Sequence, residues 1–290
     1  MILRTVGGRP NLPYQAWRKD VHSQSGEDGI IEHLLEAVQC RSGYFVEFGA
    51  WDGRHLSNSA RLADEGWSGC FIEGSTERFQ DLLRNYADND RIYKLNAFVE
   101  GFGENCLDNL LDIAKAPAEI AVLSIDIDGN DYHVWNGMVR HAAKLVVVEF
   151  NPSIPAHVVY VQEDDPSINR GASLAALTEL AKEKGYDLVA ATDWNAFFLQ
   201  KSLVDEFGIA TYTPAQVKNP EYEAAIFHGF DGTLLVAGNR QLIWHGIDYG
   251  PEELQILPPS LRRIPIAQDA AYFEELQSFI AQRRADRQPS

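Results

Sequence analysis

Short apolar runs alternate with amphipathic stretches through the middle of the chain. Five of these runs are rich in β-branched and aromatic residues and are typical of buried parallel strands: 44–50, 69–75, 91–99, 119–128 and 144–151. The stretches between them place apolar residues three and four positions apart, which is the period of an amphipathic helix. One helix is expected over 56–66, and the clearest one runs over 173–185 and ends at a glycine. The pattern therefore predicts five strand–helix units in series.

The last part of this region contains two consecutive predicted strands with no helix between them. Residues 186–192 and 196–200 are apolar and are separated only by 193–195, a gap short enough for a hairpin. Strand–helix units followed by a hairpin predict an α/β fold, with a mostly parallel sheet covered by helices on both faces. In such sheets ligands bind beyond the carboxyl ends of the strands, so site residues are expected there.

Three segments follow from this pattern. Residues 1–40 are interpreted as an N-terminal helical cover, and 41–201 as the core. Residues 202–290 are interpreted as a C-terminal extension, packed on the core or covering its substrate side. This extension contains several prolines and is irregular until a final helix over 270–288.

The charge balance narrows the classes of partner. With 42 acidic and 25 basic side chains, the formal net charge is −17, which disfavours nucleic acid and anionic membrane as general partners. No run approaches the roughly 20 apolar residues of a membrane span, and the N-terminus does not read as a secretory signal. The three cysteines lie far apart without metal-type spacing, so a reduced, cytoplasmic compartment is the simplest expectation.

The ends of the first two predicted strands indicate a nucleoside-type ligand. Gly49 and Gly53, in EFGAWDG, would let the backbone approach a ligand, although this is not the GxGxxG motif of dinucleotide sites. Glu47 and Glu73 mark the two strand ends, and an acid after the second strand suits the two hydroxyls of a ribose. The alternative is a pair of ordinary turns with incidental acids. S-adenosylmethionine carries a ribose and a cationic amino-acid portion but no phosphate, so it matches an acidic cleft of this kind. Asn96, after the third predicted strand, is where the adenine edge would lie; the alternative is that it is only a turn residue.

The ends of the fourth and fifth predicted strands carry a second polar group. Strand alternation places Asp126 and Asp128 on one side of the fourth strand. Glu149 and Asn151 likewise share one side of the fifth. Neighbouring parallel strands would bring these carboxylate and amide oxygens together, as Mg²⁺ or another hard divalent ion requires. The alternative is a hydrogen-bonded acid pair that holds a ligand or a loop.

Two histidines are candidates for a general base, beside Asp126 itself. His133 lies early in the helix after the fourth strand, where it would take a substrate proton near neutral pH. The alternative is a helix histidine bonded to a neighbour. His157, in the loop after the fifth strand, is a rival base, and Asp131 is expected to cap the helix that carries His133.

The most distinctive segments form a set: SQSGEDGIIEHLLE, the stretch from YFVEFGA to FIEGS, LSIDIDGNDYHVW, VVVEFNPSIPAHVVYVQEDD, and the stretch from GASLAAL to AFFLQ. With these motifs, residues 23–200 resemble FkbM-type S-adenosylmethionine-dependent methyltransferases. The resemblance implies a class I methyltransferase fold, a three-layer Rossmann-like sheet of seven strands with the last one antiparallel. The antiparallel strand agrees with the hairpin predicted from the pattern.

The resemblance also implies roles for individual residues. The cofactor-binding residues that it implies are Gln24, Ser25, Glu47, Gly49, Gly53 and Glu73. Asp126 with Glu149 and Asn151 looks like the metal triad of metal-dependent O-methyltransferases. The chain departs from the pattern at Trp51, where many methyltransferases have glycine, and at Asp128, where many FkbM-type members have glutamate. The expected cofactors are S-adenosylmethionine and, with it, Mg²⁺.

The expected activity is O-methylation, in which a hydroxyl of a sugar or natural product attacks the sulfonium methyl in line. The alternatives are an N- or carboxyl-methyltransferase and a non-catalytic module that binds S-adenosylmethionine within a biosynthetic complex. The expected partner is a small-molecule or glycan acceptor, not nucleic acid or membrane. A homodimer is one assembly that is compatible with the sequence.

Overall fold

The computed structural model describes residues 12–266 and 268–286. The chain divides into a sheet unit that ends at Pro220 and a C-terminal unit that begins at Glu221. The sheet unit therefore includes 202–220, which the pattern assigned to the C-terminal extension. That the extension covers the substrate side stays a prediction. Among the described residues, no helix is both long enough and apolar enough to cross a membrane.

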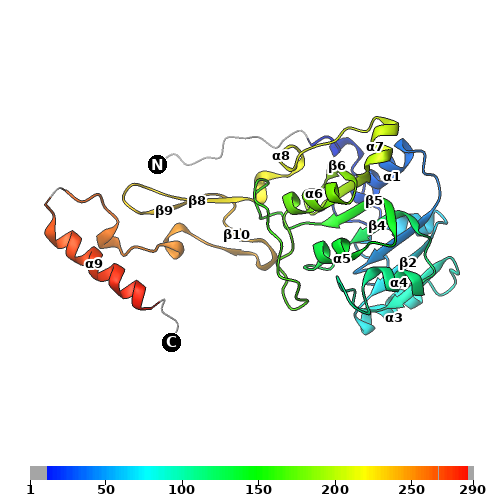
Figure 1. Cartoon of the computed structure of the whole chain (residues 1–290), viewed down its shortest axis with the longest axis horizontal. Coiled ribbons are helices and arrows are strands. Elements are labelled where there is room, and N and C mark those ends of the chain that lie inside the picture. The colour runs from blue at the N-terminus through cyan, green and yellow to red at the C-terminus, as the bar shows by residue number, and fades with distance from the viewer. Residues whose placement is uncertain (1–11, 267, 287–290) are drawn as a thin grey trace. The chain divides into compact units, whose positions relative to one another are not determined.

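The sheet unit is built on seven strands (Figure 1). They are β1 (Tyr44–Phe48), β2 (Ser68–Glu73), β3 (Ile92–Asn96), β4 (Glu119–Ile125), β5 (Ala142–Glu149), β6 (Tyr186–Ala191) and β7 (Asn195–Gln200). Their order is β3-β2-β1-β4-β5-β7-β6, with β7 antiparallel to both of its neighbours and the other pairs parallel. The predicted Rossmann-like sheet of seven strands with an antiparallel last strand is confirmed.

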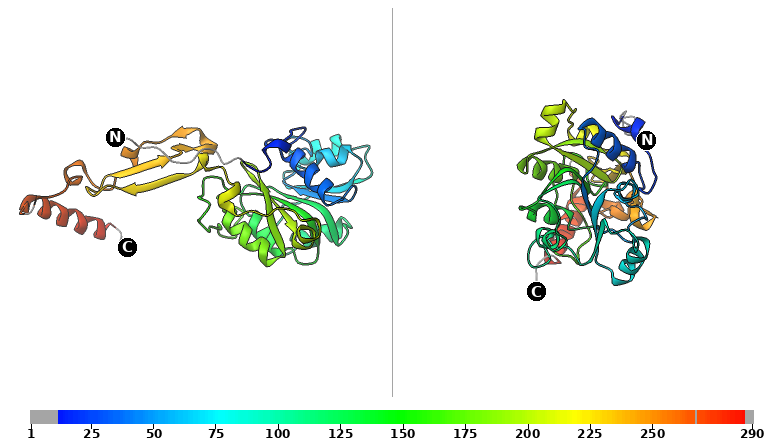
Figure 2. Two further views of the ribbon diagram at one scale, coloured as in Figure 1. Left: turned by 90° about the horizontal axis from the view of Figure 1, so that it is seen from above. Right: turned by 90° about the vertical axis from the view of Figure 1, so that its right-hand side faces the viewer.

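Helices cover both faces of this sheet (Figure 2). They are α1 (Glu27–Ala37), α2 (Ala60–Asp64), α3 (Thr76–Asn85), α4 (Leu107–Ile113), α5 (Asp131–Gly137), α6 (Leu174–Glu183), α7 (Lys201–Phe207) and α8 (Pro214–Val217). Leu111 of α4, Trp135 of α5 and Leu177 of α6 belong to one buried core. Ile31 of α1 and Leu82 of α3 belong to a second core on the other face. The sheet is thus the middle of three layers.

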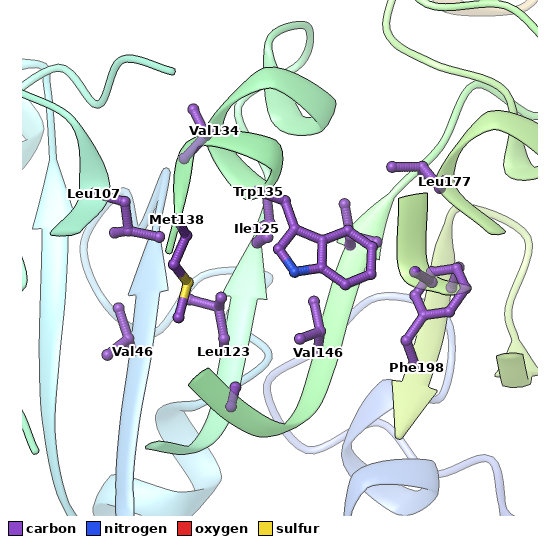
Figure 3. Close-up of a cluster of buried hydrophobic side chains, with 14 of the residues drawn as sticks. Val46, Leu107, Leu123, Ile125, Val134, Trp135, Met138, Val146, Leu177 and Phe198 are labelled. Carbon is purple, nitrogen blue, oxygen red and sulfur yellow. The ribbon is translucent and has the colours of Figure 1, made fainter. Parts of the chain in front are cut away.

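Trp135 lies near the middle of the first core (Figure 3). Its ring centroid is 5.2 Å from that of Phe198 in β7, and Val146 of β5 lies below it. Met138 points toward the β1–β4 side of the same core. Truncating a buried aromatic residue of this kind typically costs about 3–5 kcal/mol. The packing therefore holds α5 firmly against β4 and β5, whose carboxyl ends carry the candidate site.

The helix predicted over 56–66 is shorter than expected, because α2 begins only at Ala60. The Ser57 hydroxyl and the Ser59 N–H each donate to Glu47 at 2.8 Å. These bonds hold the preceding residues in a turn against β1 instead of a helix. The start of the predicted helix is therefore wrong.

The C-terminal unit, described by itself, contains two short antiparallel strand pairs and one long helix. Its elements are β8 (Ala224–His228), β9 (Leu234–Gly238), β10 (Gln241–Leu242), β11 (Ile247–Asp248) and α9 (Ala270–Ala285). Short 3₁₀ helices occur in the chain at Gln15–Trp17, Pro220–Tyr222, Ile243–His245, Pro251–Leu254 and Pro259–Leu261. The strands were not predicted, although 229–233, with two glycines between apolar runs, is a hairpin signal. The predicted final helix is confirmed over Ala270–Ala285, with Asp269 capping it by accepting from the Tyr272 N–H at 3.1 Å. Residues 287 and 288 of that prediction lie outside the described residues.

Candidate functional site

The carboxyl ends of β1 and β4 form the centre of the candidate site. The strand order reverses between these two neighbours, which is where open α/β sheets bind ligands. Gly49, after β1, has a φ of +73°, and a Cβ there would lie 1.7 Å from the carbonyl oxygen of Asp126. At Gly53 a Cβ would lie 2.7 Å from the ring of Tyr86. Both glycines were predicted to let the backbone approach a ligand, and both allow close approach of the protein's own atoms.

Glu47 in β1 is buried, and the following loop engages its carboxylate. The oxygens accept from Ser57 Oγ at 2.8 Å, Asn58 N at 3.2 Å and Ser59 N at 2.8 Å. Burial raises the pKa of Glu47 to about 7, although these hydrogen bonds act in the opposite direction. The residue predicted to bind the cofactor thus fixes the loop between β1 and α2.

Within the described part of the chain, the carboxylate of Glu73 at the end of β2 is held by backbone N–H groups alone. One carboxylate oxygen accepts from the Trp51 N–H at 2.7 Å, and the other accepts from the Ser75 N–H at 2.6 Å. A carboxylate has about four lone-pair sites, so these two donors leave acceptor capacity on both oxygens. A fixed acid with free acceptor sites therefore stands where the sequence predicted a ribose-binding residue.

Two exposed aromatic rings stand beside Glu73. Trp51 is 43% exposed, and the Arg78 guanidinium lies 4.0 Å from its ring centroid. Phe98 is 73% exposed and lies against Gly74, where a Cβ would be 2.4 Å from the ring. Exposed rings next to a fixed acid suit a planar base attached to a hydroxylated sugar.

Asn96, which was predicted to meet the adenine edge, has its side-chain amide bound to the protein. Its Nδ2 donates to the carbonyl oxygens of Glu73 at 2.7 Å and Gly74 at 3.2 Å. Its Oδ1 accepts from Thr76 Oγ1 at 3.3 Å. The side chain therefore ties the end of β3 to the end of β2, and a contact with adenine stays a prediction.

The first residue of α1, Glu27, is a residue of the site region that the sequence reasoning missed. Gln24 is exposed, and the Ser25 N–H donates to one oxygen of Glu27 at 2.7 Å. Glu27 is fully buried, and its other oxygen accepts from Thr192 Oγ1, in the β6–β7 turn, at 2.7 Å and from Asn195 Nδ2, at the start of β7, at 3.3 Å. Because Asn195 pairs with Glu149 across β5 and β7, Glu27 anchors the segment before α1 close to the acids at the end of β5. The signal in the sequence that could have identified Glu27 is an acid at the start of a largely apolar helix.

Three acids come together at the ends of β4 and β5. Ile125 pairs with Val148 in the parallel register, so the next residues, Asp126 and Glu149, are neighbours. One oxygen from each of Asp126, Asp128 and Glu149 lies within 4.8 Å of the others. The structure therefore brings together the three acids that strand alternation predicted to converge.

These acids are in an unfavourable electrostatic environment. Burial raises the pKa of Asp126 well above its usual value, and the negative charges of Asp131 and Asp128 raise it further. Burial also raises the pKa of Glu149, with the charge of Asp126 as the next cause. A divalent cation would relieve this repulsion, and carboxylate oxygens are the ligands that Mg²⁺ prefers. The residues present therefore fit a hard metal ion.

The loop between β4 and α5 is folded around Asp131. Its carboxylate accepts from the backbone N–H groups of Ile127 and Gly129, each at 2.9 Å. Asp131 is the first residue of α5, and the prediction that it caps this helix is wrong, because it holds the loop before the helix. Asp128 has a φ of +57°, a left-handed conformation that aspartate tolerates better than most residues.

Asn151, the fourth residue predicted to bind a metal, is engaged by the loop that follows β5. Its Oδ1 accepts from the Ser153 N–H at 2.9 Å and from the Ser153 hydroxyl at 2.6 Å. Its Nδ2 donates to the Arg170 carbonyl at 2.9 Å. The amide therefore joins the two ends of the loop 150–173, and a role as metal ligand stays a prediction.

The His133 ring is tied to the same loop. Its Nε2 lies 2.8 Å from the backbone carbonyl oxygen of Gln162. Because a carbonyl can only accept, Nε2 carries the hydrogen and Nδ1 is left as the acceptor. The Gln162 side chain holds the loop by donating to Asn130 Oδ1 at 2.7 Å. His157, the rival base, is exposed on this loop.

No protein-family model matches the chain, and no curated protein matches it. Solved structures to which the chain is similar include the N-terminal domain of EvdMO1 in the presence of SAH and D-fucose, at 10% identity and a TM-score of 0.41, covering 60% of this chain and 82% of that one. A putative caffeoyl-CoA O-methyltransferase from Staphylococcus aureus is 12% identical, with a TM-score of 0.42 and coverage of 63% and 86%. A putative O-methyltransferase from Klebsiella pneumoniae is 15% identical, with a TM-score of 0.40 and coverage of 64% and 86%.

Proposed function

We propose that the chain is an S-adenosylmethionine-dependent methyltransferase of the FkbM type, which methylates a hydroxyl of a sugar or natural product. The observation that carries the proposal is the carboxylate of Glu73 at the end of β2. Two backbone N–H groups fix it, and acceptor sites remain for the two hydroxyls of a ribose. The exposed rings of Trp51 and Phe98 beside it would take the base.

The charge of this sheet edge favours a cationic ligand that carries no phosphate. Carboxylates stand at the ends of three strands of the sheet, β2, β4 and β5: Glu73, Asp126, Asp128 and Glu149. S-adenosylmethionine, when bound, supplies a methyl group on a positively charged sulfur. A diphosphate would meet repulsion from the same carboxylates. The acidic edge therefore supports this cofactor over a dinucleotide.

Asp126, Asp128 and Glu149 would hold a Mg²⁺ ion. The fit rests on three hard oxygens within 4.8 Å of one another and on the raised pKa values of Asp126 and Glu149. A bound divalent ion would supply positive charge that lowers the pKa of an acceptor hydroxyl.

His133 is the residue that would take the hydroxyl proton. Its Nε2–H is committed to the Gln162 carbonyl, so the proton would go to Nδ1. The same hydrogen bond fixes the orientation of the ring, as a base that acts at one position requires. The loop 150–173 would help to hold the acceptor in place, since it carries both Gln162 and the exposed His157.

Isothermal titration calorimetry with S-adenosylhomocysteine tests the cofactor assignment. The wild-type chain is expected to bind, and Glu73→Gln is expected to bind at least about tenfold more weakly, because hydrogen bonds to a charged acceptor contribute about 1.5–3 kcal/mol. Glu77→Gln, an exposed neighbour on α3, is the matched control and should bind like wild type. Absence of binding, or equal binding by the Glu73 variant, would contradict the proposal.

Transfer of a labelled methyl group to a panel of sugars and natural products tests the reaction. Methylation of a hydroxyl that is stimulated by Mg²⁺ and suppressed by a chelator is expected. A product methylated on nitrogen or on a carboxylate would contradict the assigned acceptor. Cofactor binding without transfer to any acceptor would favour the non-catalytic module.

A further inference from the structure

A groove of about 390 Å³ lies between α1 and α2, entirely within the sheet unit. Its buried floor is apolar and consists of Ile31, Leu35, Leu62 and Trp67. Small-molecule sites usually have volumes of roughly 300–1,000 Å³ and mostly apolar linings with a few polar groups. The groove therefore has the size and the floor of a binding site for a small ligand.

The buried polar residue of this groove that stands out is Asp28 in α1, which is 2% exposed. Its Oδ2 accepts from the N–H groups of Val21 and His22 at 2.8 Å and from the N–H and hydroxyl of Ser23 at 2.9 Å. Its Oδ1 is buried and has no hydrogen-bond partner among the residues that the structure describes. Buried polar atoms in folded proteins nearly always have a partner, so a donor is missing at this position.

The charges around the groove indicate which kind of ligand group would donate to Asp28 Oδ1. The groove is lined by four carboxylates and by two arginines, Arg41 and Arg61. The carboxylates are Asp28, Glu32, Glu36 and Glu65. Arg61 is already paired with Glu32 and Glu65, so the acids exceed the available basic groups. A cationic donor fits this balance better than an anion or a neutral sugar.

We infer that this groove binds a small molecule that carries a primary ammonium group on an apolar body. The ammonium donates to Asp28 Oδ1, and the apolar body lies against Leu62 and Trp67. The ligand is distinct from the one at the carboxyl edge of the sheet, because the apolar floor belongs to the layer between α1 and α2.

Asn58 connects this groove to the candidate active site. It lines the groove, its N–H donates to Glu47 at 3.2 Å, and its side chain donates to Ser124 Oγ at 3.0 Å. Glu47 fixes the loop after β1, and Ser124 lies two residues before Asp126. An amine in the groove would therefore change the affinity at the carboxyl edge, and the effect would be reciprocal. This linkage, unlike the binding itself, rests on the proposed function.

Calorimetric titration of the whole chain with 2-phenylethylamine, without cofactor, tests the binding. Saturable binding of one amine per chain is expected, and phenylacetate, with a similar body and the opposite charge, should bind at least tenfold more weakly. The absence of saturable amine binding, or equal binding of phenylacetate, would overturn the inference.

Two variants locate the site. Asp28→Asn keeps an acceptor oxygen for the Val21–Ser23 segment and replaces the unpartnered oxygen with an amide donor, so amine affinity should fall at least tenfold. Leu62→Trp should fill the groove and abolish binding, whereas Leu83→Trp, on the exposed side of α3, is the matched control and should not. The Leu62 variant keeps the test decisive if the Asp28 variant does not fold. Unchanged amine affinity in a folded variant at either position would place the amine elsewhere and overturn the inference.

The linkage is measured as the affinity for S-adenosylhomocysteine with and without saturating 2-phenylethylamine. A change of at least threefold is expected, and no change would overturn the connection through Asn58. A chain that binds the amine but not S-adenosylhomocysteine would contradict the proposed function and leave the amine site standing.

Discussion

Two acidic groups lie at opposite edges of the same part of the sheet: Asp108 is buried, whereas Asp126 and Glu149 are half-buried and Asp128 is exposed. At the amino edge, where β5 begins, Asp108 of α4 accepts from four donors at 2.7–3.1 Å: the N–H groups of Val139, Arg140 and His141, and His141 Nδ1. At the carboxyl edge of β4 and β5, Asp126 and Glu149 instead face each other and Asp128. The fold thus surrounds one acid with donors and places the others beside further negative charge.

The pKa values of the two groups shift in opposite directions. Burial raises the pKa of Asp108, but the hydrogen bonds from Val139, Arg140 and His141 together outweigh it, and the pKa is lowered. Burial raises the pKa of Asp126, and the charges of Asp131 and Asp128 add to the effect. Asp108, which supports the structure of the protein itself, is surrounded by hydrogen-bond donors. Acids left in mutual repulsion are suited to bind something else, which distinguishes a site from a scaffold.

The largest expected effect is the loss of stability on removing Asp108. Asp108→Ala would leave buried N–H groups and His141 without their acceptor, and should lower the free energy of unfolding by about 3–5 kcal/mol. The exposed neighbour Asp112 is the control, and Asp112→Ala should cost at most about 1 kcal/mol. Asp126→Asn, measured without divalent ions, should not lower stability. Urea unfolding measures all three, and an equal loss for the Asp126 and Asp108 variants would remove the distinction between the two edges.

The two edges also differ in how tightly the chain packs at their glycines. Gly49 at the carboxyl edge and Gly185 at the amino edge have φ of +73° and +83°. A Cβ at Gly49 would lie 1.7 Å from the Asp126 carbonyl oxygen, whereas a Cβ at Gly185 would meet no atom within 4 Å. Gly185→Ala therefore carries only the backbone cost of about 1 kcal/mol. Gly49→Ala should cost about 2–3 kcal/mol and also weaken S-adenosylhomocysteine binding, because the loop after β1 must move.

Thermal unfolding and calorimetry on both alanine variants measure this difference. Similar stability losses for the two variants, with cofactor affinity unchanged, would show that the contact between Gly49 and Asp126 has no role in shaping the site.

The sequence predicted the sheet well because its signal is local. Buried parallel strands are continuous apolar runs, and the short gap 193–195 indicated the antiparallel strand. The failures come from contacts between distant residues. Glu47 shortens α2 by binding Ser57 and Ser59, and no property of residues 56–66 alone reveals that acceptor.

The same reasoning explains what could be predicted of the site. Asp126 and Glu149 converge because strand alternation and strand neighbours determine where they point. Asn96 and Asn151 end with their amides on backbone groups, and Glu27 becomes part of the site region through the β6–β7 turn. Those hydrogen-bond partners depend on the three-dimensional conformations of the loops. Loop conformation leaves no periodic pattern in the sequence from which the partners could be predicted. Acids at strand ends are therefore predictable, and the partners of side-chain amides are not.

The smallest expected effect is a dependence of stability on pH that a divalent ion reverses. Asp126 and Glu149 have pKa values in the folded chain above those of the unfolded chain, so protonation favours the folded state. Their contribution is therefore present at low pH and is lost as the pH rises above the unfolded values of about 4. Between pH 5 and pH 8 in a chelator, wild type should lose on the order of 1 kcal/mol relative to Asp126→Asn, whereas Asp90→Asn, exposed and remote, should follow wild type.

Mg²⁺ should restore this stability, and more so at pH 8 than at pH 6, because protons compete with the ion for the same oxygens. An ion at 100 times its dissociation constant would add about 2.7 kcal/mol to a folded state that alone binds it. Asp126→Asn should lose most of that gain, and Asp90→Asn should keep it. Parallel curves of stability against pH for wild type and Asp126→Asn, or an equal Mg²⁺ effect in both, would contradict this prediction. The acids of the carboxyl edge would then need no bound cation, as Asp108 needs none, and the two edges would differ only in position.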